Sequence, residues 1–265
     1  MKHSPFTLVY EDENIVALNK SSGIAVSPDR WDPSIERLDK LAAEFFKVQK
    51  LYTVHRIDKE TSGLVIFAKN SETHKALSLA FEGRQIKKRY IAAVHGRPPW
   101  SETTCDLALV PNGNKQHLTI VDKFRGKKSF TAFRLLGSAG NYSILEALPE
   151  TGRTHQIRVH LASLGHPVVC DELYGNDKPV LLSAIKRNWR GDLLEERPLL
   201  SRLGLHAAEL FIPDYAALNS AALGTTEAGL HLKAPLPRDM AALIRQMEKA
   251  SGKDLLYKEE LSQRR

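Results

Sequence analysis

A run of chemically reactive side chains occupies residues 55–63, His-Arg-Ile-Asp-Lys-Glu-Thr-Ser-Gly. It lies directly before an apolar segment, and protein scaffolds commonly place functional groups on a loop that leads into a buried strand. The simpler interpretation is that Asp58, Thr61 and Ser62 cap turns while Gly63 supplies a special backbone angle. Composition alone leaves both interpretations open.

A second polar cluster lies at residues 151–160, Thr-Gly-Arg-Thr-His-Gln-Ile-Arg-Val-His. Gly152 leaves room for a close backbone approach. Arg153 is predicted at a helix N-terminus, where the helix dipole disfavours a cation, so a carboxylate or phosphate partner would explain it better than solvent. The alternative is a capped surface helix with solvated arginines.

The histidines and cysteines do not form a convincing metal site. His155 and His160 are five residues apart and diverge by roughly 140° on a helix, so they do not share a face, and His166 does not complete a set. We expect these histidines to form hydrogen bonds or to face RNA. Cys105 and Cys170 are far apart in the chain, which argues against a thiolate zinc site or a disulfide framework and favours a reducing compartment.

Length and composition are those of a globular protein, with 265 residues, 42% hydrophobic and 26% charged. They exclude disorder, collagen and small disulfide scaffolds. The N-terminal residues have no apolar signal segment, and no stretch approaches the ~18 apolar residues that a membrane helix needs. We therefore expect a cytoplasmic protein that does not contact a membrane.

The charge balance favours a polyanionic partner, because 38 Lys and Arg oppose 31 Asp and Glu for a net charge of +7. Charge alone does not choose between RNA, DNA and a membrane. Basic residues concentrate in two successive stretches, the first of which contains Tyr90, and this suits binding to a phosphate backbone although such runs are often only solvated faces. They are Arg84, Lys87, Lys88, Arg89, Arg97, Lys115, Lys123, Arg125, Lys127, Lys128 and Arg134.

Apolar periodicity predicts an α+β fold with a mostly antiparallel or mixed sheet. Strands are predicted at residues 8–10, 15–18, 64–68, 90–94, 118–121, 130–135 and 142–148. Helices are predicted from Asp32 and Pro33 to Phe45, from Ser71 to Phe81, from Thr154 to Leu164 and around Met240 to Met247. The phosphate-binding glycine motifs are missing, so no nucleotide cofactor is expected.

Four segments, in this order, resemble the signature segments of the RluA family of RNA pseudouridine synthases. They are residues 55–63, Lys88-Arg89-Tyr90, residues 151–161 and Leu205-His206-Ala207. Residues 19–23, 126–128 and 165–175 look like further family segments. The resemblance implies one pseudouridine-synthase-like catalytic domain over residues 5–250, with a central sheet flanked by helices and a charged C-terminal tail at residues 251–265.

The sequence departs from the family pattern in three respects. Ser21 and Ile57 stand where the family usually has Pro and Leu, and both changes are mild. Many members carry an N-terminal S4-type RNA-binding module, and this chain resembles a member without one. Substrate choice would then depend on the catalytic domain, including residues 176–203, which form a longer segment than a minimal member needs.

The resemblance implies that uridine in RNA is isomerised to pseudouridine without a cofactor or metal. Asp58 would be the nucleophile, attacking either the ribose C1′ or the uracil ring. Arg153 would keep the Asp58 carboxylate ionised by opposite charge. Tyr90 would stack on the uracil and help remove the C5 proton.

RNA recognition would require base flipping, whose lost stacking must be offset by pocket contacts. Arg56 resembles the arginine that fills the space left by the flipped base. Lys88, Arg89 and Arg158 are expected to contact phosphates, and the partner is expected to be structured ribosomal or transfer RNA. We expect a monomer.

Two other functions compete with this one. A catalytically silent RNA-binding or chaperone protein could keep the fold and its basic face, but the presence of Asp58, Tyr90 and Arg153 together favours an enzyme. A glycosidase needs two carboxylates on either side of one bond, and Asp58 and Glu60 are near neighbours that can diverge.

Overall fold

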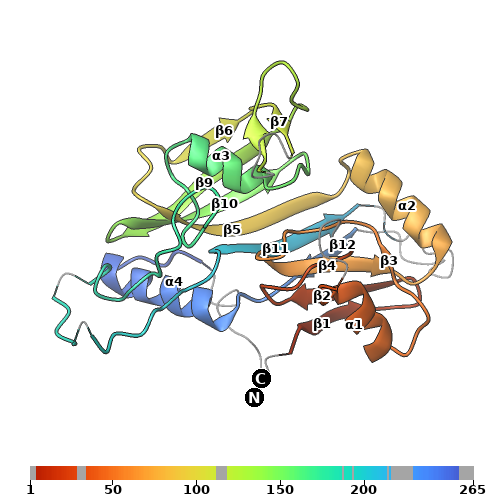
Figure 1. The fold of residues 1–265 in the computed structure, drawn as a ribbon, viewed down its shortest axis with the longest axis horizontal. Coiled ribbons are helices and arrows are strands. Elements are labelled where there is room, and N and C mark those ends of the chain that lie inside the picture. The colour runs from red at the N-terminus through yellow and green to blue at the C-terminus, as the bar shows by residue number, and fades with distance from the viewer. Residues whose placement is uncertain are drawn as a thin grey trace. The chain divides into compact units, whose positions relative to one another are not determined.

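The computed structural model describes residues 4–28, 34–111, 118–186, 188–192, 194–213, 215 and 229–256. The chain divides into two compact units, each drawn in Figure 1. The first unit comprises Met1–Lys88 and Ala207–Ala234, and the second comprises Arg89–His206 and Pro235–Arg265.

The first unit is built on antiparallel strand pairs. Strand β1 (Phe6–Glu11) pairs with β2 (Ile15–Lys20), β2 pairs with β4 (Ser62–Ala68), and β3 (Tyr52–Thr53) also pairs with β4. Strand β11 (Leu205–Ile212) lies next to β4 in the sheet and pairs antiparallel with β12 (Leu230–Lys233). The strands predicted at residues 8–10, 15–18 and 64–68 are confirmed.

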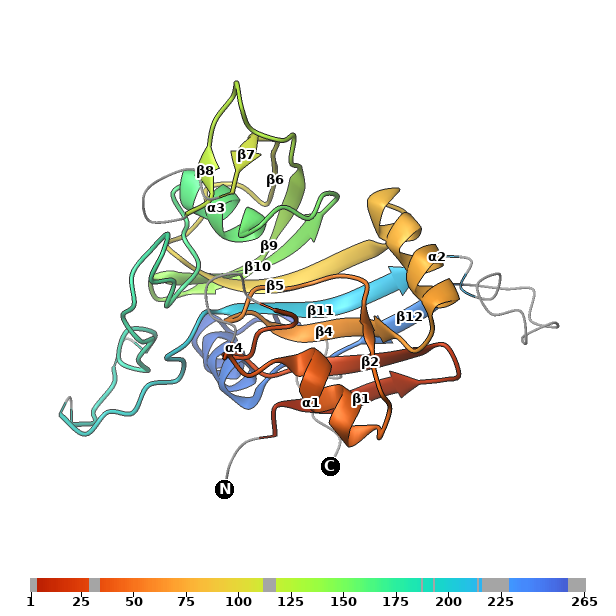
Figure 2. The same ribbon diagram turned by 45° about the vertical axis from the view of Figure 1, so that its right-hand side comes forward.

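Two helices lie beside these strands (Figures 1 and 2). Helix α2 (Ser71–Glu82) begins as predicted, because the Asn70 side chain accepts a hydrogen bond from the amide of Thr73. Helix α1 (Leu38–Phe45) begins later than predicted, with Arg37 at its N-cap. The predicted cap residues Asp32 and Pro33 lie outside the described residues. Phe45, the last residue of the predicted helix, is 64% exposed.

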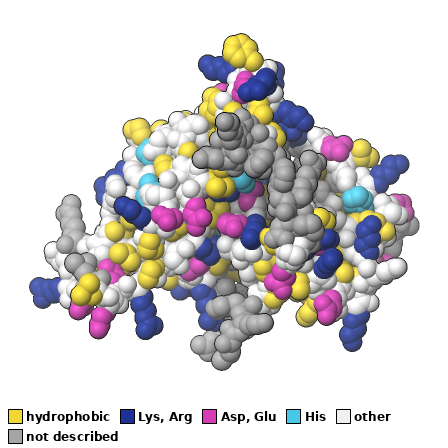
Figure 3. All heavy atoms as spheres, in the orientation of Figure 1, with side chains coloured by type: hydrophobic (Ala, Val, Ile, Leu, Met, Phe, Trp, Pro, Cys, Tyr) yellow, Lys and Arg dark blue, Asp and Glu magenta, His cyan; other side chains and the backbone are white. Residues whose placement is uncertain are grey.

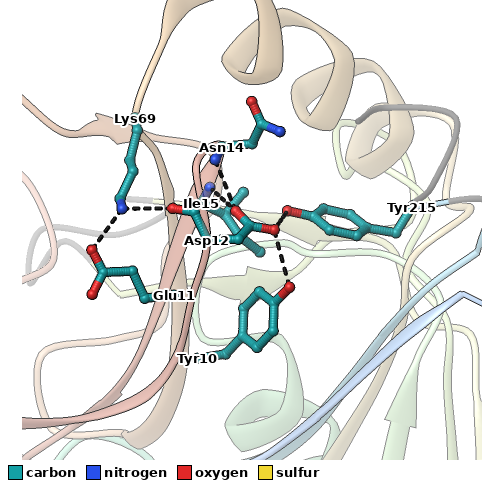
Figure 4. Close-up of polar contacts among 7 residues, drawn as sticks. All are labelled: Tyr10, Glu11, Asp12, Asn14, Ile15, Lys69 and Tyr215. Carbon is teal, nitrogen blue, oxygen red and sulfur yellow. Dashed lines mark hydrogen bonds and ion pairs between the residues drawn. The ribbon is translucent and has the colours of Figure 1, made fainter. Parts of the chain in front are cut away.

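The turn between β1 and β2 is organised by Asp12 (Figure 4). Its Oδ1 accepts hydrogen bonds from the amides of Asn14 and Ile15, each 2.8 Å long. Its Oδ2 accepts from the hydroxyls of Tyr10 at 3.0 Å and Tyr215 at 2.7 Å. The carboxylate thus replaces the backbone partners that a tight turn leaves unpaired.

The core of the first unit lies between α2 and the strands. Its fully buried members come from β2, β4, α2 and β11, at the alternating positions that a strand turns toward one face. They are Ile15, Ala17, Leu64, Ile66, Leu77, Leu210 and Ile212. This apolar layer supports β4, the strand into which the 55–63 cluster leads.

In the second unit, four strands form antiparallel pairs in the order β5–β10–β9–β6. They are β5 (Lys87–His95), β10 (Tyr142–Pro149), β9 (Thr131–Ala139) and β6 (Glu102–Cys105). A separate small pair joins β7 (Leu109–Val110) to β8 (Ile120–Val121), which is shorter than the predicted strand at 118–121. The strands predicted around residues 90, 130 and 142 are confirmed.

Two helices complete the second unit. Helix α3 (Gln156–Ser163) starts two residues after the predicted Thr154, and α4 (Arg238–Ser251) carries the predicted apolar stripe from Met240 to Met247. Within the predicted tail, residues 252–254 are exposed while Leu255 and Leu256 are buried, and residues 257–265 lie outside the described part of the chain. The α+β prediction with a mostly antiparallel sheet is confirmed.

Val180 and Leu200, near the two ends of the long segment at residues 176–203, are hydrogen-bonded to each other. The amide of Val180 donates to the carbonyl of Leu200 at 2.8 Å, and both side chains are buried. None of the helices among the described residues is both long and apolar enough to cross a bilayer.

Candidate active site

The loop that carries Asp58 is held by the segment after β2. Lys20 is only 1% exposed, and its ammonium group donates to the carbonyls of Lys59 and Ser21, each at 2.9 Å. The amide of Gly23 donates to the same Lys59 carbonyl at 2.8 Å. Because the residue next to Asp58 is fixed from two sides, the position of the half-buried Asp58 is constrained.

Ser21, next to Lys20, makes two hydrogen bonds to the N-terminal segment, and a proline at this position could not make both of them. Its amide donates to the carbonyl of Pro5 and its Oγ to the carbonyl of Ser4, both at 2.9 Å. Proline has no amide hydrogen to donate. The departure at residue 21 is therefore matched to a local contact of this chain with its own N-terminal segment.

His55 fixes the start of the loop. Its Nε2 accepts a hydrogen bond from the amide of Ile66 at 3.0 Å, and its ring stacks on Phe81 with centroids 4.6 Å apart. Burial, with a smaller contribution from the charge of Lys88, lowers the pKa of His55 to about 3. The ring is therefore neutral at pH 7 and positions the loop.

Gly63 marks the point where two of the signature segments meet. Its φ is +115°, and a Cβ placed on it would lie 2.2 Å from the carbonyl oxygen of Ala207. Only glycine allows both this backbone angle and this approach. The special role of Gly63 considered from the sequence is confirmed, and its reason is the closeness of the 55–63 and 205–207 segments.

Two basic side chains predicted to bind RNA belong to the first unit. Arg56 is exposed and Lys88 is partly exposed. Both lie next to fixed points of the backbone, Arg56 beside His55 and Lys88 on β5. The roles of Arg56 and Lys88 in RNA binding stay predictions.

Tyr90 and Arg89 are adjacent on β5, where Tyr90 pairs with Ala147 of β10. The Tyr90 ring is partly buried and packs against the core of the second unit. The Arg89 Nε lies 2.5 Å from Oε1 of the buried Glu146, whose other oxygen is 3.0 Å from Arg134. Arg89 thus already has a carboxylate partner, which sequence reasoning did not find.

The turn that carries Arg153 is organised by the buried amide of Gln156. Its Oε1 accepts from the Thr151 hydroxyl at 2.7 Å and from the Arg153 amide at 3.0 Å. Its Nε2 donates to the Phe130 carbonyl and to the Thr131 hydroxyl. All four bonds that a primary amide prefers are formed, so the backbone at Arg153 is fixed to the start of β9.

Arg153 does not lie at the helix N-terminus that the sequence predicted. Helix α3 begins at Gln156 with His155 as N-cap in a left-handed conformation, φ +53°. The partly exposed Arg153 side chain donates through Nε to the carbonyl of Lys128 at 3.3 Å. The dipole argument for an anionic partner is therefore wrong, whereas the role in catalysis stays a prediction.

Arg158 is a buried structural residue. Its guanidinium makes two bonds to Asp171, 2.8 and 2.7 Å long, and lies 5.2 Å from the ring centre of Tyr174. The side chain is 5% exposed and that of Asp171 is 0% exposed. The prediction that Arg158 contacts a phosphate does not fit this geometry, because the cation is enclosed and paired.

The histidines of the second cluster act as hydrogen-bonding groups. His155 Nδ1 lies 2.8 Å from the Tyr174 hydroxyl, and the buried His160 contacts Ser129 and Thr131 through its two ring nitrogens. Burial lowers the pKa of His160, which keeps this ring neutral. Over the part of the chain that the structure describes, no group of three His, Cys, Asp or Glu is placed to hold a metal.

Comparison with known proteins decides the family. The family model described as RNA pseudouridylate synthase matches residues 14–163, more than half of the chain, including Asp58, Tyr90 and Arg153. The chain belongs to this family. The resemblance drawn from the signature segments is thereby confirmed.

Relatives of known name agree with this membership. The dual-specificity RNA pseudouridine synthase RluA of Vibrio vulnificus is 34% identical over 213 residues, 78% of this chain and 77% of that protein. The ribosomal large subunit pseudouridine synthase D of Borreliella burgdorferi is 37% identical over 179 residues, 64% of this chain. The chain spans 55% of that protein and 57% of the Zymomonas mobilis protein of the same name.

Solved structures support the fold of this chain. The human RNA pseudouridylate synthase domain containing 4 superposes with a TM-score of 0.66, covering 91% of this chain and 92% of that one, at 23% identity. The human domain containing 1 protein gives 0.65 at 24% identity. These likenesses establish the architecture, while the chemistry depends on individual residues.

Proposed function

We propose that this protein isomerises uridine to pseudouridine in structured RNA. The observation that carries the proposal is the family match over residues 14–163, which contains the Asp58, Tyr90 and Arg153 motifs in order. The clamping of the Asp58 loop by Lys20 supports it, because a nucleophile needs a fixed position.

In the proposed reaction the bond between ribose C1′ and uracil N1 breaks, and a new bond forms between C1′ and C5. The C5 hydrogen leaves to water and N1 gains a hydrogen, so the RNA mass is unchanged. Asp58 acts as nucleophile at C1′ or on the uracil ring, Tyr90 stacks on the base and assists C5 deprotonation, and Arg153 is the third catalytic residue.

The proposed substrates are ribosomal and transfer RNA, bound by a monomer in the cytoplasm without a cofactor. Arg56 fills the space of the flipped base, and Lys88 and Arg89 contact phosphates. The excess of 38 basic over 31 acidic residues supports a polyanionic substrate.

The test is tritium release from C5-tritiated uridine in separate ribosomal and transfer RNA pools. Wild type should release tritium from at least one pool, and Asp58→Asn should release none while folding and binding RNA normally. Glu60→Gln, the same change two residues away in the same loop, is the matched control and should keep full turnover.

Three outcomes would reject parts of the proposal. Normal turnover by Asp58→Asn would remove the nucleophile assignment. RNA binding by wild type without tritium release from either pool would favour a catalytically silent RNA-binding protein. Free uracil with abasic sites would identify a base-removing glycosidase.

A further inference from the structure

The turn after β8, Asp122 to Lys128, presents an aromatic ring to solvent among basic side chains. Phe124 is 98% exposed. Lys123, Lys127 and Lys128 are exposed, and the Arg125 side chain is 72% exposed. Figures 1 and 2 show this connection projecting beyond β7 and β8, and Figure 3 shows hydrophobic and basic side chains together at that end.

The turn is ordered by one carboxylate. Asp122 Oδ1 accepts from the amides of Phe124 at 2.9 Å and Arg125 at 3.0 Å, and Oδ2 accepts from the Arg125 guanidinium at 2.7 Å. These donors, the Arg125 amide foremost, hold the pKa of Asp122 below its usual range. The carboxylate is therefore ionised at neutral pH, and it fixes the backbone on both sides of Phe124.

The base of the turn is fixed to neighbouring strands. The amide of Asp122 donates to the carbonyl of Ala108 at 3.0 Å, and Lys127 and Leu109 exchange two backbone bonds of 2.9 and 3.0 Å. A Cβ on Gly126 would lie 2.3 Å from the carbonyl of Asp122, so only glycine fits there. Phe124 is therefore exposed on an ordered turn whose backbone is held by hydrogen bonds.

Exposing a large apolar side chain in this way forgoes burial that would stabilise the fold. Four cations and one carboxylate lie within residues 122–128, which suits a phosphate backbone. An aromatic face beside such cations is the arrangement on which unpaired bases stack. The Lys128 carbonyl also accepts from Arg153, so the turn is attached to a residue of the proposed reaction.

We infer that the 122–128 turn is an RNA-binding finger in which Phe124 stacks on an unpaired base while Lys123, Lys127 and Lys128 contact neighbouring phosphates. The inference rests on the proposed function for its substrate class. It adds a contact at Phe124, which lies outside the family-like segments, and this contact would select RNA with an unpaired base near the modified uridine.

The chain offers a matched control at Leu194, which is 95% exposed. Its amide donates to Asp192 Oδ1 at 2.8 Å, as the Phe124 amide does to Asp122 Oδ1. Acidic residues follow it at Glu195 and Glu196. Leu194→Ala therefore removes an exposed apolar side chain that is followed by two acidic residues, with Arg190 and Arg197 as the nearest basic residues in the chain.

The experiment measures RNA binding by wild type and by Phe124→Ala, Phe124→Leu, Phe124→Tyr and Leu194→Ala. Probes are the ribosomal and transfer RNA pools and a short oligouridine carrying one 2-aminopurine, whose fluorescence falls when it stacks. The Ala and Leu changes at Phe124 should weaken binding by about 5- to 100-fold, the loss of one stacked base, with unfolding curves unchanged.

Phe124→Tyr and Leu194→Ala should bind like wild type, and only variants with a ring at residue 124 should quench 2-aminopurine. Replacing Lys123 and Lys127 by Gln should lower the salt dependence of binding by about one to two phosphate contacts. Binding that Phe124→Ala leaves unchanged, or that Phe124→Leu restores as well as Tyr does, would overturn the inference.

Two further results distinguish the RNA-binding finger from a membrane contact and from the proposed reaction. Loss of binding to phosphatidylserine vesicles, with RNA binding unchanged in Phe124→Ala, would assign the turn to a membrane surface and overturn the finger. RNA binding that depends on Phe124 without tritium release by wild type would reject the proposed reaction and keep the finger. Normal tritium release with binding independent of Phe124 would do the reverse.

Discussion

The hydroxyl of Tyr215 donates a 2.7 Å hydrogen bond to Oδ2 of Asp12, which lies 203 residues earlier in the chain (Figure 4). Burial by itself would raise the pKa of Asp12, but hydrogen bonds from Tyr215, from the Ile15 and Asn14 amides and from Tyr10 outweigh it and lower the pKa. Burial and this same bond raise the pKa of Tyr215. The pair joins the first hairpin to the segment after β11.

We expect Tyr215→Phe to destabilise the protein by about 1.5 to 3 kcal/mol, because it removes a hydrogen bond to a charged group. Urea unfolding at pH 7 measures the change. Tyr10→Phe, which removes the longer 3.0 Å bond to the same oxygen, should cost less. Equal stability of Tyr215→Phe and wild type would show that the bond contributes nothing.

The Asp12 contribution should depend on acid in one direction. The lowered pKa means that folding favours the ionised carboxylate, so its stabilisation is present above the unfolded pKa of about 3.9 and fades as pH falls toward the folded pKa. The stability difference between wild type and Asp12→Asn should be constant above about pH 5 and shrink below about pH 4. A difference that grows in acid would contradict this assignment.

His55 should make the fold sensitive to mildly acidic pH. Its folded pKa of about 3 lies below the unfolded value of about 6.5, so the stability contributed by the neutral ring is complete above pH 6.5 and declines as pH falls. His55→Gln, whose amide oxygen can still accept from Ile66, should reduce that decline by up to about 1.4 kcal/mol per pH unit. Unfolding curves at several pH values between 4 and 7 give both slopes, and equal slopes would show that His55 does not resist protonation.

Gly63 should tolerate no side chain. Gly63→Ala combines a φ of +115° with a 2.2 Å approach to the Ala207 carbonyl, and we expect a loss of more than about 3 kcal/mol or failure to fold. Gly23→Ala is the control, because its φ is +89° and nothing lies within 4 Å of the added Cβ. The control should cost about 1 kcal/mol in thermal unfolding. Similar losses in both variants would mean that backbone angle alone matters.

Removing Asp171 should show that Arg158 is structural. Asp171→Asn leaves a buried guanidinium without its counter-charge, and we expect a loss of about 3 to 5 kcal/mol in urea unfolding. Asp239→Asn breaks the more exposed pair with Arg202 and should cost about 1 kcal/mol or less. A stable Asp171→Asn variant with weakened RNA binding would instead return Arg158 to the phosphate contacts.

Sequence reasoning found the strands and helices wherever apolar periodicity was strong, as in β4, α2 and α4. It placed the start of α1 too early because capping residues at 32 and 33 match a local rule that the observed helix start at Leu38 does not follow. It also identified the motif segments, because Gly63 and the Thr151-Gly152-Arg153 run can be recognised from their residue types without knowledge of distant partners.

Long-range partners could not be predicted from the sequence. Arg153 and Arg158 are close in the chain and cannot be told apart by residue type. In the structure, however, Arg158 is buried and paired with Asp171, whereas Arg153 is partly exposed. The same holds for Arg89 and Glu146, which are 57 residues apart. The sign of this buried ion pair in the sequence is the acidic residue Asp171, which lies in the 165–175 segment that resembles the family.

The four hydrogen bonds of the Gln156 amide also help to fix the register between strands β9 and β10. Thr151 follows the end of β10, Phe130 and Thr131 lie at the start of β9, and Gln156 bonds to all three. A slip of β10 against β9 by one residue would turn alternate side chains to the opposite face and carry Thr151 away from both partners. The hairpin tip at 139–142 can therefore change in evolution only by steps that keep the two strands aligned.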